Sequence, residues 1–526
     1  MATPNIVPRA DSEGGLGTAS KYWASAYIDA ITTTGDITVG GIVNAVNINL
    51  TDSGGGNMIV LDSSSGDGSI RWEDNNTQKW DMGRDNTDNS WALSNTAGLG
   101  SSNVLTFDHS TGNATFSGTI NGIPFYSDTT NNSMYTHDVS GTDDSAAQNT
   151  AYGFQALDAI TTGDDNTAIG FAAGGAITTG LYNIAIGSYA GDALVSGTKN
   201  VAIGYAALST EDSYGKSVAI GYEALKVQNA AADANNVAVG HQAGLDVTTG
   251  YENVLIGSLA GDNLTTGIEN TAVGFQALSA AQTSHANVAI GHQSLAIQSA
   301  DGYTFNTAVG YNSGQQVTSG SQQVMIGAYA GDALTTGAQN VAIGYKALTG
   351  EDTGNKNIAI GTNALEVLNY DGDGYNVAVG HDAGKSVTTG VQNTLIGGLS
   401  GDALTGGQEN VAIGYNTLSG TQFANYNVAI GRGSMSAAAL SNANVGVGVN
   451  TLAALSQSSG TSTYNVAVGY NAGKLISTGV QNTLIGSLAG DALSTGDRNT
   501  ALGAYALSTE DTGSRSTAIG WYSLLM

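Results

Sequence analysis

Five aspartates recur at one place in a sequence repeat and offer carboxylate oxygens of the kind that bind calcium. They are Asp192, Asp262, Asp332, Asp402 and Asp491. A calcium ion in a protein takes about six to eight oxygen ligands, and each place supplies a single carboxylate. Neighbours are at least 70 residues apart, which strand stacking would turn into about 19 Å. We therefore interpret these aspartates as turn residues.

Three histidines, His241, His292 and His381, also share one position in the repeat. The first two would lie about 14 Å apart in a stack of strands, so they cannot share a metal ion within one chain. A threefold assembly would form rings of three histidines if this position faced its axis, and the sequence leaves that alternative open. We predict no metal site.

One short string, Asp108-His109-Ser110, puts the residue types of a hydrolytic triad side by side. A triad needs its members brought together by the fold, so we attribute this adjacency to chance. No paired carboxylates stand out from the repeats, and the GxG strings lack the context of a phosphate-binding loop. We therefore expect neither an enzyme nor a cofactor.

The histidines and aspartates belong to an array whose unit is the nonapeptide NVAIGYAAL, at residues 200–208. Its glycine recurs 22 times between residues 153 and 520, in steps of 17 residues except for three of 19 and one of 21. Among these structural glycines are Gly170, Gly187, Gly204, Gly221, Gly240, Gly257, Gly274, Gly344 and Gly414. Three steps of 17 residues and one of 19 together form a superblock of 70 residues. A regular repeat of about 17 residues indicates a solenoid in which each repeat forms one coil.

Positions in each repeat are numbered here from its glycine. A β-branched residue at −3 and Ile or Val at −1 would point to one side of a short strand, and small residues at −2 and 0 to the other. TTG, STG and TSG segments supply turns. We predict that each coil contains a strand, a turn, a second short strand and a turn. We also expect the branched residues to fill the coil.

Two further columns of the repeat could bind ligands. Asparagine occupies position −4 in 19 of 22 copies, as in Asn166, Asn183, Asn200, Asn340 and Asn410. Its amides could face a ligand, but we predict a structural ladder of hydrogen bonds along the stack. An aromatic residue often follows the glycine, as in Tyr205 and Phe275. This column could stack on sugars, but it shares the side of the Ile/Val column, so we predict packing.

The composition limits the remaining possibilities. The net charge of −28, with 15 basic residues, argues against nucleic acid and against an anionic membrane surface as partners. There is no cysteine, so thiol catalysis and disulfides are excluded. No run of about 18 apolar residues predicts a membrane helix, and the first residues do not form a secretory signal.

The chain divides by composition into four regions: 1–40, 41–125, 126–148 and 149–526. Residues 41–125 contain SIRWEDNNTQKWDMGRD and VLTFDHSTGNATFSGTI, which are typical of strands joined by polar turns, so we predict a small β domain there. Residues 126–148 are polar and are interpreted as a connector. Residues 149–526 hold the array.

The motif NxAIGxxAL, repeated over residues 149–526, resembles the head repeats of YadA-type trimeric autotransporter adhesins. The resemblance implies an all-β fold, a left-handed parallel β-roll of about 22 seventeen-residue coils. It also implies a homotrimer and surface adhesion. Ala and Gly at −2 and 0 would then let the three chains approach closely. The chain ends in a repeat and lacks that family's membrane anchor, so we do not expect it to export itself to a bacterial surface.

The N-terminal stretches NIVPRADSEGGLGTASKYWASAYID and GDITVGG resemble the start of fibre proteins of tailed phages, cyanophages in particular. WDMGRD and LTFDHSTGNATFSG are similar to segments of phage tail fibres. The resemblance implies that residues 1–40 attach to virion proteins, and that the array projects as a rod toward a host-surface receptor, with glycans among the candidates.

We therefore expect a structural and adhesive phage fibre, made in the host cytoplasm and located on the virion. A capping or tip protein at the C-terminus is a further candidate partner. The alternatives are a bacterial trimeric surface adhesin and, less favoured, a polysaccharide-degrading tailspike, for which no acid pair is evident.

Overall fold

The structure is a computed structural model. It describes residues 68–74, 77–84, 90–94, 103–110, 114–116, 119–120, 123–124, 126–128, 132–136, 145–420, 422–437 and 439–524. These residues are all-β, without a helix among them. The chain divides into two compact units, Met1–Thr115 and Phe116–Met526. The expected attachment segment, residues 1–40, lies outside the described residues.

The first unit contains the predicted strands of the tryptophan-rich region. They form one sheet in the order β1-β2-β3-β4-β5, antiparallel between β1 and β4. Their bounds are β1 Gly68–Asp74, β2 Thr77–Arg84, β3 Trp91–Ser94, β4 Asn103–Phe107 and β5 Ala114–Phe116. Trp72 lies opposite Trp80 in the register of β1 and β2. The ring of Trp91 packs on that of Phe107 with centroids 5.6 Å apart.

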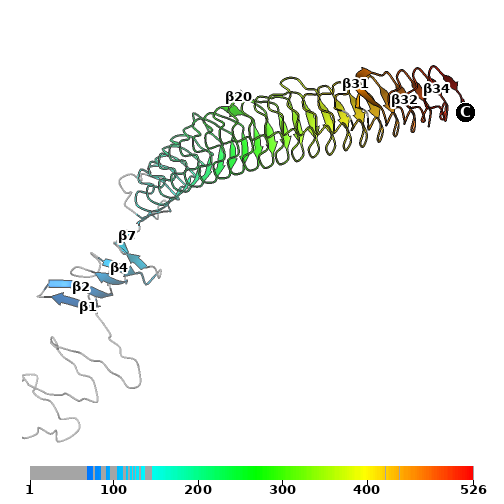
Figure 1. Ribbon diagram of the computed structural model, residues 1–526. Helices are drawn as coiled ribbons and strands as arrows, with labels where there is room; N and C mark the ends of the chain where they lie inside the picture. The colour runs from blue at the N-terminus through cyan, green and yellow to red at the C-terminus, as the bar shows by residue number, and fades with distance from the viewer. Residues whose placement is uncertain are drawn as a thin grey trace, which may run out of the picture. The chain divides into compact units, whose positions relative to one another are not determined.

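The second unit begins with short hairpins and continues as a solenoid whose strands lie side by side along one wall (Figure 1). The hairpin strands are β6 Thr119–Ile120 with β7 Ile123–Pro124, and β8 Tyr126–Asp128 with β9 Ser133–Tyr135. Because β9 pairs with β10, the first coil strand, part of segment 126–148 belongs to the solenoid sheet.

The predicted parallel β-solenoid of about 22 coils is confirmed. Each coil contributes one three-residue strand, and these strands pair in parallel in chain order. They are β10 Thr150–Tyr152, β11 Thr167–Ile169, β12 Ile184–Ile186, β13 Val201–Ile203, β14 Val218–Ile220, β15 Val237–Val239, β16 Val254–Ile256, β17 Thr271–Val273, β19 Val288–Ile290, β21 Thr307–Val309, β22 Val324–Ile326, β23 Val341–Ile343, β24 Ile358–Ile360, β25 Val377–Val379, β26 Thr394–Ile396, β27 Val411–Ile413, β28 Val428–Ile430, β30 Val445–Val447, β32 Val466–Val468, β33 Thr483–Ile485, β34 Thr500–Leu502 and β35 Thr517–Ile519. Equivalent residues are in register, as Ala202 is with Ala219.

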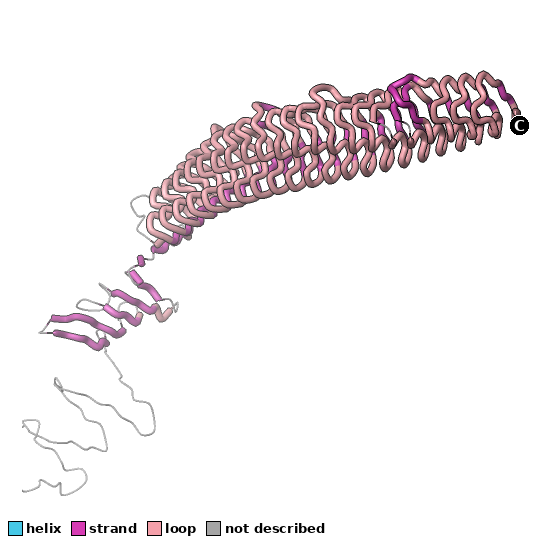
Figure 2. Tube along the Cα trace, viewed as in Figure 1, coloured by secondary structure: helices cyan, strands magenta, loops and turns pink. Residues whose placement is uncertain are grey.

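The predicted second strand of each coil is absent from most of the described coils, where turns make up the rest (Figure 2). Turns suffice because backbone groups outside the strands also bond from coil to coil; the Thr178 amide, for example, donates to the Val195 carbonyl at 2.9 Å. Additional strands occur on longer coils and their neighbours, where they form two small parallel sheets. These are β18 Ser284–His285 with β20 Gly302–Tyr303, and β29 Ala439–Asn442 with β31 Ser456–Ser462.

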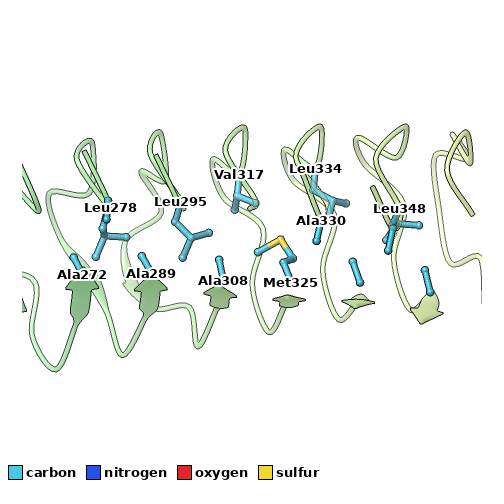
Figure 3. Close-up of a cluster of buried hydrophobic side chains, with 14 of the residues drawn as sticks. Ala272, Leu278, Ala289, Leu295, Ala308, Val317, Met325, Ala330, Leu334 and Leu348 are labelled. Atoms are coloured by element: carbon cyan, nitrogen blue, oxygen red, sulfur yellow. The ribbon is translucent and has the colours of Figure 1, made fainter. Parts of the chain in front are cut away.

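The faces of the strands are the reverse of the prediction. The alanine at −2 points inward and is fully buried, as Ala202 and Ala342 are, while the branched residues at −3 and −1 point outward. The interior is narrow, so the strand contributes a methyl group and the facing turns contribute leucine, isoleucine, valine or methionine at +4, at +7 or at both. Figure 3 shows Ala272 and Ala289 pointing toward Leu278 and Leu295.

Residue volumes are balanced across this interior. Where position −2 is large, as with Leu255, Met325, Leu395 and Leu484, position +4 of the same coil is glycine. A Cβ atom on Gly261 would lie 2.8 Å from the Cδ2 atom of Leu255. Such compensation is expected because protein interiors are close-packed.

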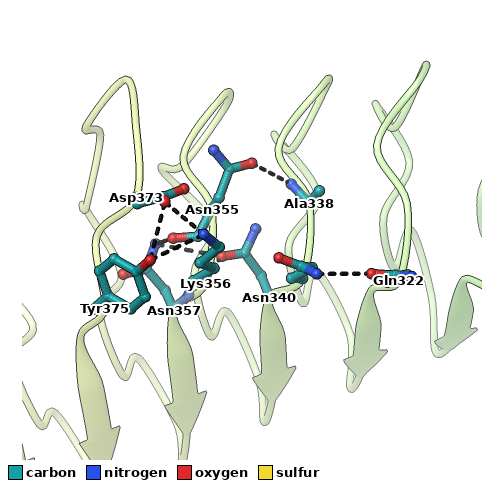
Figure 4. A network of polar contacts seen from close by, with 9 residues as sticks. Gln322, Ala338, Asn340, Asn355, Lys356, Asn357, Asp373 and Tyr375 are labelled. Atoms are coloured by element: carbon teal, nitrogen blue, oxygen red, sulfur yellow. Dashed lines mark hydrogen bonds and ion pairs between the residues drawn. The ribbon is translucent and has the colours of Figure 1, made fainter.

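The asparagines at −4 form a buried ladder along the stack. The backbone amide of Asn183 donates to Asn166 Oδ1 at 3.0 Å, and Asn183 Nδ2 donates to the Gly197 carbonyl at 2.8 Å. Asn183 Oδ1 in turn accepts from the backbone amide of Asn200 at 3.0 Å. The same contact joins Asn357 to Asn340 (Figure 4). Each side chain therefore satisfies buried backbone groups that the turns leave unpaired.

One gap in this ladder is filled from another position. Ser217 replaces asparagine at position −4, and Gln228 at position +7 of the same coil reaches into the interior. Its Nε2 atom donates to Ser217 Oγ and to Glu211 Oε2, both at 3.1 Å, and its Oε1 atom accepts from Asn236 Nδ2 at 2.9 Å. Two superblocks later, 140 residues on, the equivalent pair is Asn357 with the fully buried Leu368.

The invariant glycine marks the closest approach of successive coils. Gly344 has a φ of 134°, which L residues with a side chain rarely adopt. A Cβ atom there would lie 2.5 Å from the carbonyl oxygen of Gly361. Both the backbone conformation and the lack of space therefore require glycine.

Replacing Gly344 by valine is expected to lower the unfolding free energy by about 3 kcal/mol, from backbone strain plus overpacking. Amide hydrogen exchange of residues 327–361, read by mass spectrometry, would show the loss of protection. Gly398→Ser is the matched control, because three other coils have serine at this position and the nearest ring atom would be 3.5 Å away. Equal protection in the Gly344→Val variant and the control would contradict this explanation.

The Ser217–Gln228 pair allows an exchange between superblocks. Gln228→Leu alone should destabilise the solenoid by about 1–3 kcal/mol, because buried polar groups lose their partner. Adding Ser217→Asn recreates the native Asn357–Leu368 combination and should restore most of the loss. Urea unfolding followed by circular dichroism measures both variants. A double variant no more stable than Gln228→Leu would show that Gln228 does not complete the ladder.

Candidate interaction surface

The outer face of the strand wall is a continuous, uniform surface that runs along all 22 coil strands. It is formed by positions −3 and −1 of the 22 coil strands, which are Val, Ile or Thr apart from Tyr152 and Leu502. None of these positions carries a charge, although the chain has a net charge of −28. Ile326 and Ile396 each remain 38% exposed. Depletion of charge around exposed branched side chains is typical of the centre of a protein interface.

An aromatic ladder runs beside this face. The sequence predicted packing for the aromatic column; these rings do pack, but on one another, and Tyr205 stays 46% exposed. Neighbouring centroids are 5.0–6.2 Å apart in two runs. The first run is Phe154, Phe171, Tyr189, Tyr205, Tyr222 and His241, and the second is Phe275, His292, Tyr311, Tyr329 and Tyr345.

Two members of the ladder were not predicted from the sequence. Tyr189 and Tyr329 lie at position +2, in coils where position +1 is serine or alanine. Both have a φ of 59°, and this left-handed turn brings the ring into the column from one residue later. A sequence signal was present, since Tyr189, Tyr329 and Tyr505 each occupy +2 in a coil whose +1 residue is serine or alanine. Leu259, 70 residues after Tyr189, occupies the equivalent +2 position. It is not aromatic, and it lies where the ladder is interrupted between the two runs.

The arrangement of the rings limits what the ladder can bind. Tyr205, Tyr222 and His241 are stacked nearly parallel at 5.3 Å, so each ring covers a face of its neighbour. A sugar needs a free aromatic face for stacking. The ladder is therefore suited to supporting an apolar contact surface, and poorly suited to stacking on sugars.

Two of the three histidines, His241 and His292, are part of this ladder. His241 stacks on Tyr222, and His292 lies between Phe275 and Tyr311 at 5.3 and 5.0 Å. His381 Nδ1 lies 3.2 Å from Asp382 Oδ2. Within the part of the chain that the structure describes, no three His, Asp or Glu side chains form a group able to hold a metal ion.

The five recurring aspartates lie in turns at position +5 and are widely separated. In each, one carboxylate oxygen is buried without a hydrogen-bond partner. Burial raises the pKa of all five and brings that of Asp262 to about 6. This environment penalises the charged form without supplying the further oxygen ligands that calcium needs.

The string Asp108-His109-Ser110 forms a local turn. The backbone amide and the hydroxyl of Ser110 both donate to Asp108 Oδ1 at 2.7 Å. This geometry is that of an Asx turn.

Comparison with known proteins gives no relative. No family model matches the chain, and no curated protein or solved structure matches it. No helix in the described ranges is long and apolar enough to cross a membrane.

Proposed function

We propose that this chain is a structural and adhesive fibre of a tailed phage, in which three copies associate side by side into a left-handed β-roll rod. The observation that carries the proposal is the uncharged outer face of the strand wall, bordered by the aromatic ladder. The number of copies and the handedness come from the resemblance of NxAIGxxAL to trimeric adhesin heads.

The outer face favours self-association for two reasons. Its branched side chains repeat in register at every coil, so two copies present matching ridges along their whole length. Exposed apolar patches larger than a few hundred Å² are rare on monomers, and this face continues through 22 strands. A trimer would cover the face on every copy and leave the acidic residues on the outside.

Attachment to the particle is assigned to residues 1–40, on the resemblance of their sequence to phage fibre proteins. The rod would then present to a host receptor the surfaces that are not covered by association of the copies. A bacterial trimeric surface adhesin remains the alternative, since it would use the same outer face. A polysaccharide-degrading tailspike is less favoured, because the acid pair it requires was not evident in the sequence.

Mass measurement in solution tests the assembly. The 52.9 kDa chain should sediment as a species about three times heavier. Ile326→Lys with Ile396→Lys would place charge at the centre of the proposed interface and should give a folded monomer. Gln339→Lys is the control, because lysine occupies position −5 in other coils and that variant should stay trimeric. A wild-type monomer would refute the assembly.

Removal of residues 1–125 tests the function on particles. The shortened chain should keep a β-type circular dichroism spectrum and should assemble with the same number of copies as the full chain, because the solenoid strands are retained. It should fail to enter particles when it competes with the full chain, as read by a C-terminal tag on purified virions. Incorporation of the shortened chain would refute the attachment role. Full-length chain found on cell envelopes and never on particles would favour the adhesin.

A further inference from the structure

A hollow lies beside the first of the longer coils, away from the outer face. It has a volume of about 300 Å³ and is formed between the loop at 230–233 and the following coil. Its lining residues are Ala230, Ala231, Ala232, Asp233, Thr249, Tyr251 and Glu252. The volume is at the lower end of the range for small-molecule pockets, which leaves room for one ring-sized ligand.

The walls of the hollow are held in place by buried hydrogen bonds. Glu211, which is fully buried, accepts from the Ala230 amide at 3.1 Å. The Glu252 amide donates to the Ala234 carbonyl at 2.7 Å, and the Asn229 amide to the Thr248 carbonyl at 2.9 Å. These bonds tie the loop to the coils on both sides, so the hollow exists before any ligand arrives.

Tyr251 supplies an aromatic wall that the ladder cannot. Its side chain is 42% exposed and makes no ring–ring contact with another residue in the described part of the chain. Its ring is therefore available to an apolar ligand face, unlike the mutually stacked rings of the ladder. The three alanines add methyl groups to the same hollow.

The polar groups favour a ligand that donates hydrogen bonds. The Asp233 and Glu252 carboxylates can accept from hydroxyl groups, and the Thr249 hydroxyl can accept or donate. Asp233 is already paired with Lys216 at 2.6 Å, which neutralises one of the two charges. An anionic ligand would meet the Glu252 carboxylate and an acidic chain, so a neutral ligand fits best.

We propose that this hollow binds one neutral sugar residue, with an apolar face of the sugar ring on Tyr251 and its hydroxyl groups on Asp233, Glu252 and Thr249. The site would give the proposed attachment function its ligand class, and its biological meaning rests on that function. The small sheets of two longer coils rise from the edge opposite the strand wall (Figure 2), so loops of this kind stay accessible when the wall is covered.

The site is specific to the first longer coil. At the position equivalent to Tyr251, the coils after the other three longer ones have Ser321, Val391 and Val480. The second and third longer loops instead carry their own aromatic side chains. In the third, Lys356 pairs with Asp373, as Lys216 does with Asp233 in the first. Lys356 also bonds the Tyr375 hydroxyl and lies over the Tyr375 ring, 5.0 Å from its centroid (Figure 4), so it covers the ring face that a ligand would use.

Saturation-transfer NMR on the full chain tests the site, with methyl α-glucopyranoside, methyl β-galactopyranoside and N-acetylglucosamine as probes. At least one probe should bind saturably to the wild type. Tyr251→Val, which places a residue that two equivalent coils already have, should weaken that binding tenfold or more. Tyr182→Gln is the matched control, an exposed tyrosine exchanged for the glutamine found at its position in other coils, and it should bind as the wild type does.

Two results would overturn the sugar site: no binding of any probe by the wild type, or equal binding by Tyr251→Val. Preferential binding of tetramethylammonium, lost in Tyr251→Val, would also overturn it in favour of a cationic ligand. Circular dichroism and sedimentation of each variant confirm folding and assembly. Because Tyr251 lies off the outer face, failure of sugar binding would leave the trimer intact, and a monomeric chain that binds the probe would refute the trimer alone.

Discussion

The contact between successive invariant glycines sets the dimensions of the solenoid. At Gly344 the neighbouring backbone comes so near that no side chain fits, and the positive φ turns the chain sharply at the end of each strand. This close approach keeps the strands short and the interior narrow. The narrow interior in turn requires alanine inside each strand and sends the larger branched side chains outward.

Stacking in register then makes each position of the repeat a column of like residues. A column of asparagines works because the amide both donates and accepts, so every member can satisfy the next. A column of aromatic rings works because rings stack at about the spacing of strands. Ser217 shows that the requirement is the hydrogen bond and not the residue type, since Gln228 delivers the amide from another position.

The period, the number of coils and the position of each strand could be predicted from the sequence, because each depends on spacing alone. The direction of the faces could not. Alternation separates Ala202 from Val201 and Ile203, but hydrophobicity favours burial of the larger pair, and only the width of the coil reverses that choice. The leucines at +4 and +7 were the missed indication, since they already fill the interior. The Tyr251 hollow depends on how one loop folds over the next coil, which no repeat pattern contains.

The longer coils explain how one scaffold can carry different surfaces. Two extra residues between Gly221 and Gly240 leave the strands in register, as Val218 with Val237 shows. The additional length is therefore absorbed outside the strand wall, where neither the glycine contact nor the outer face is affected. Loops at these places can change in sequence without altering the stacking of the coils or the outer face of the strand wall. In the proposed fibre, such independence would keep the assembly fixed while the ligand contacts vary.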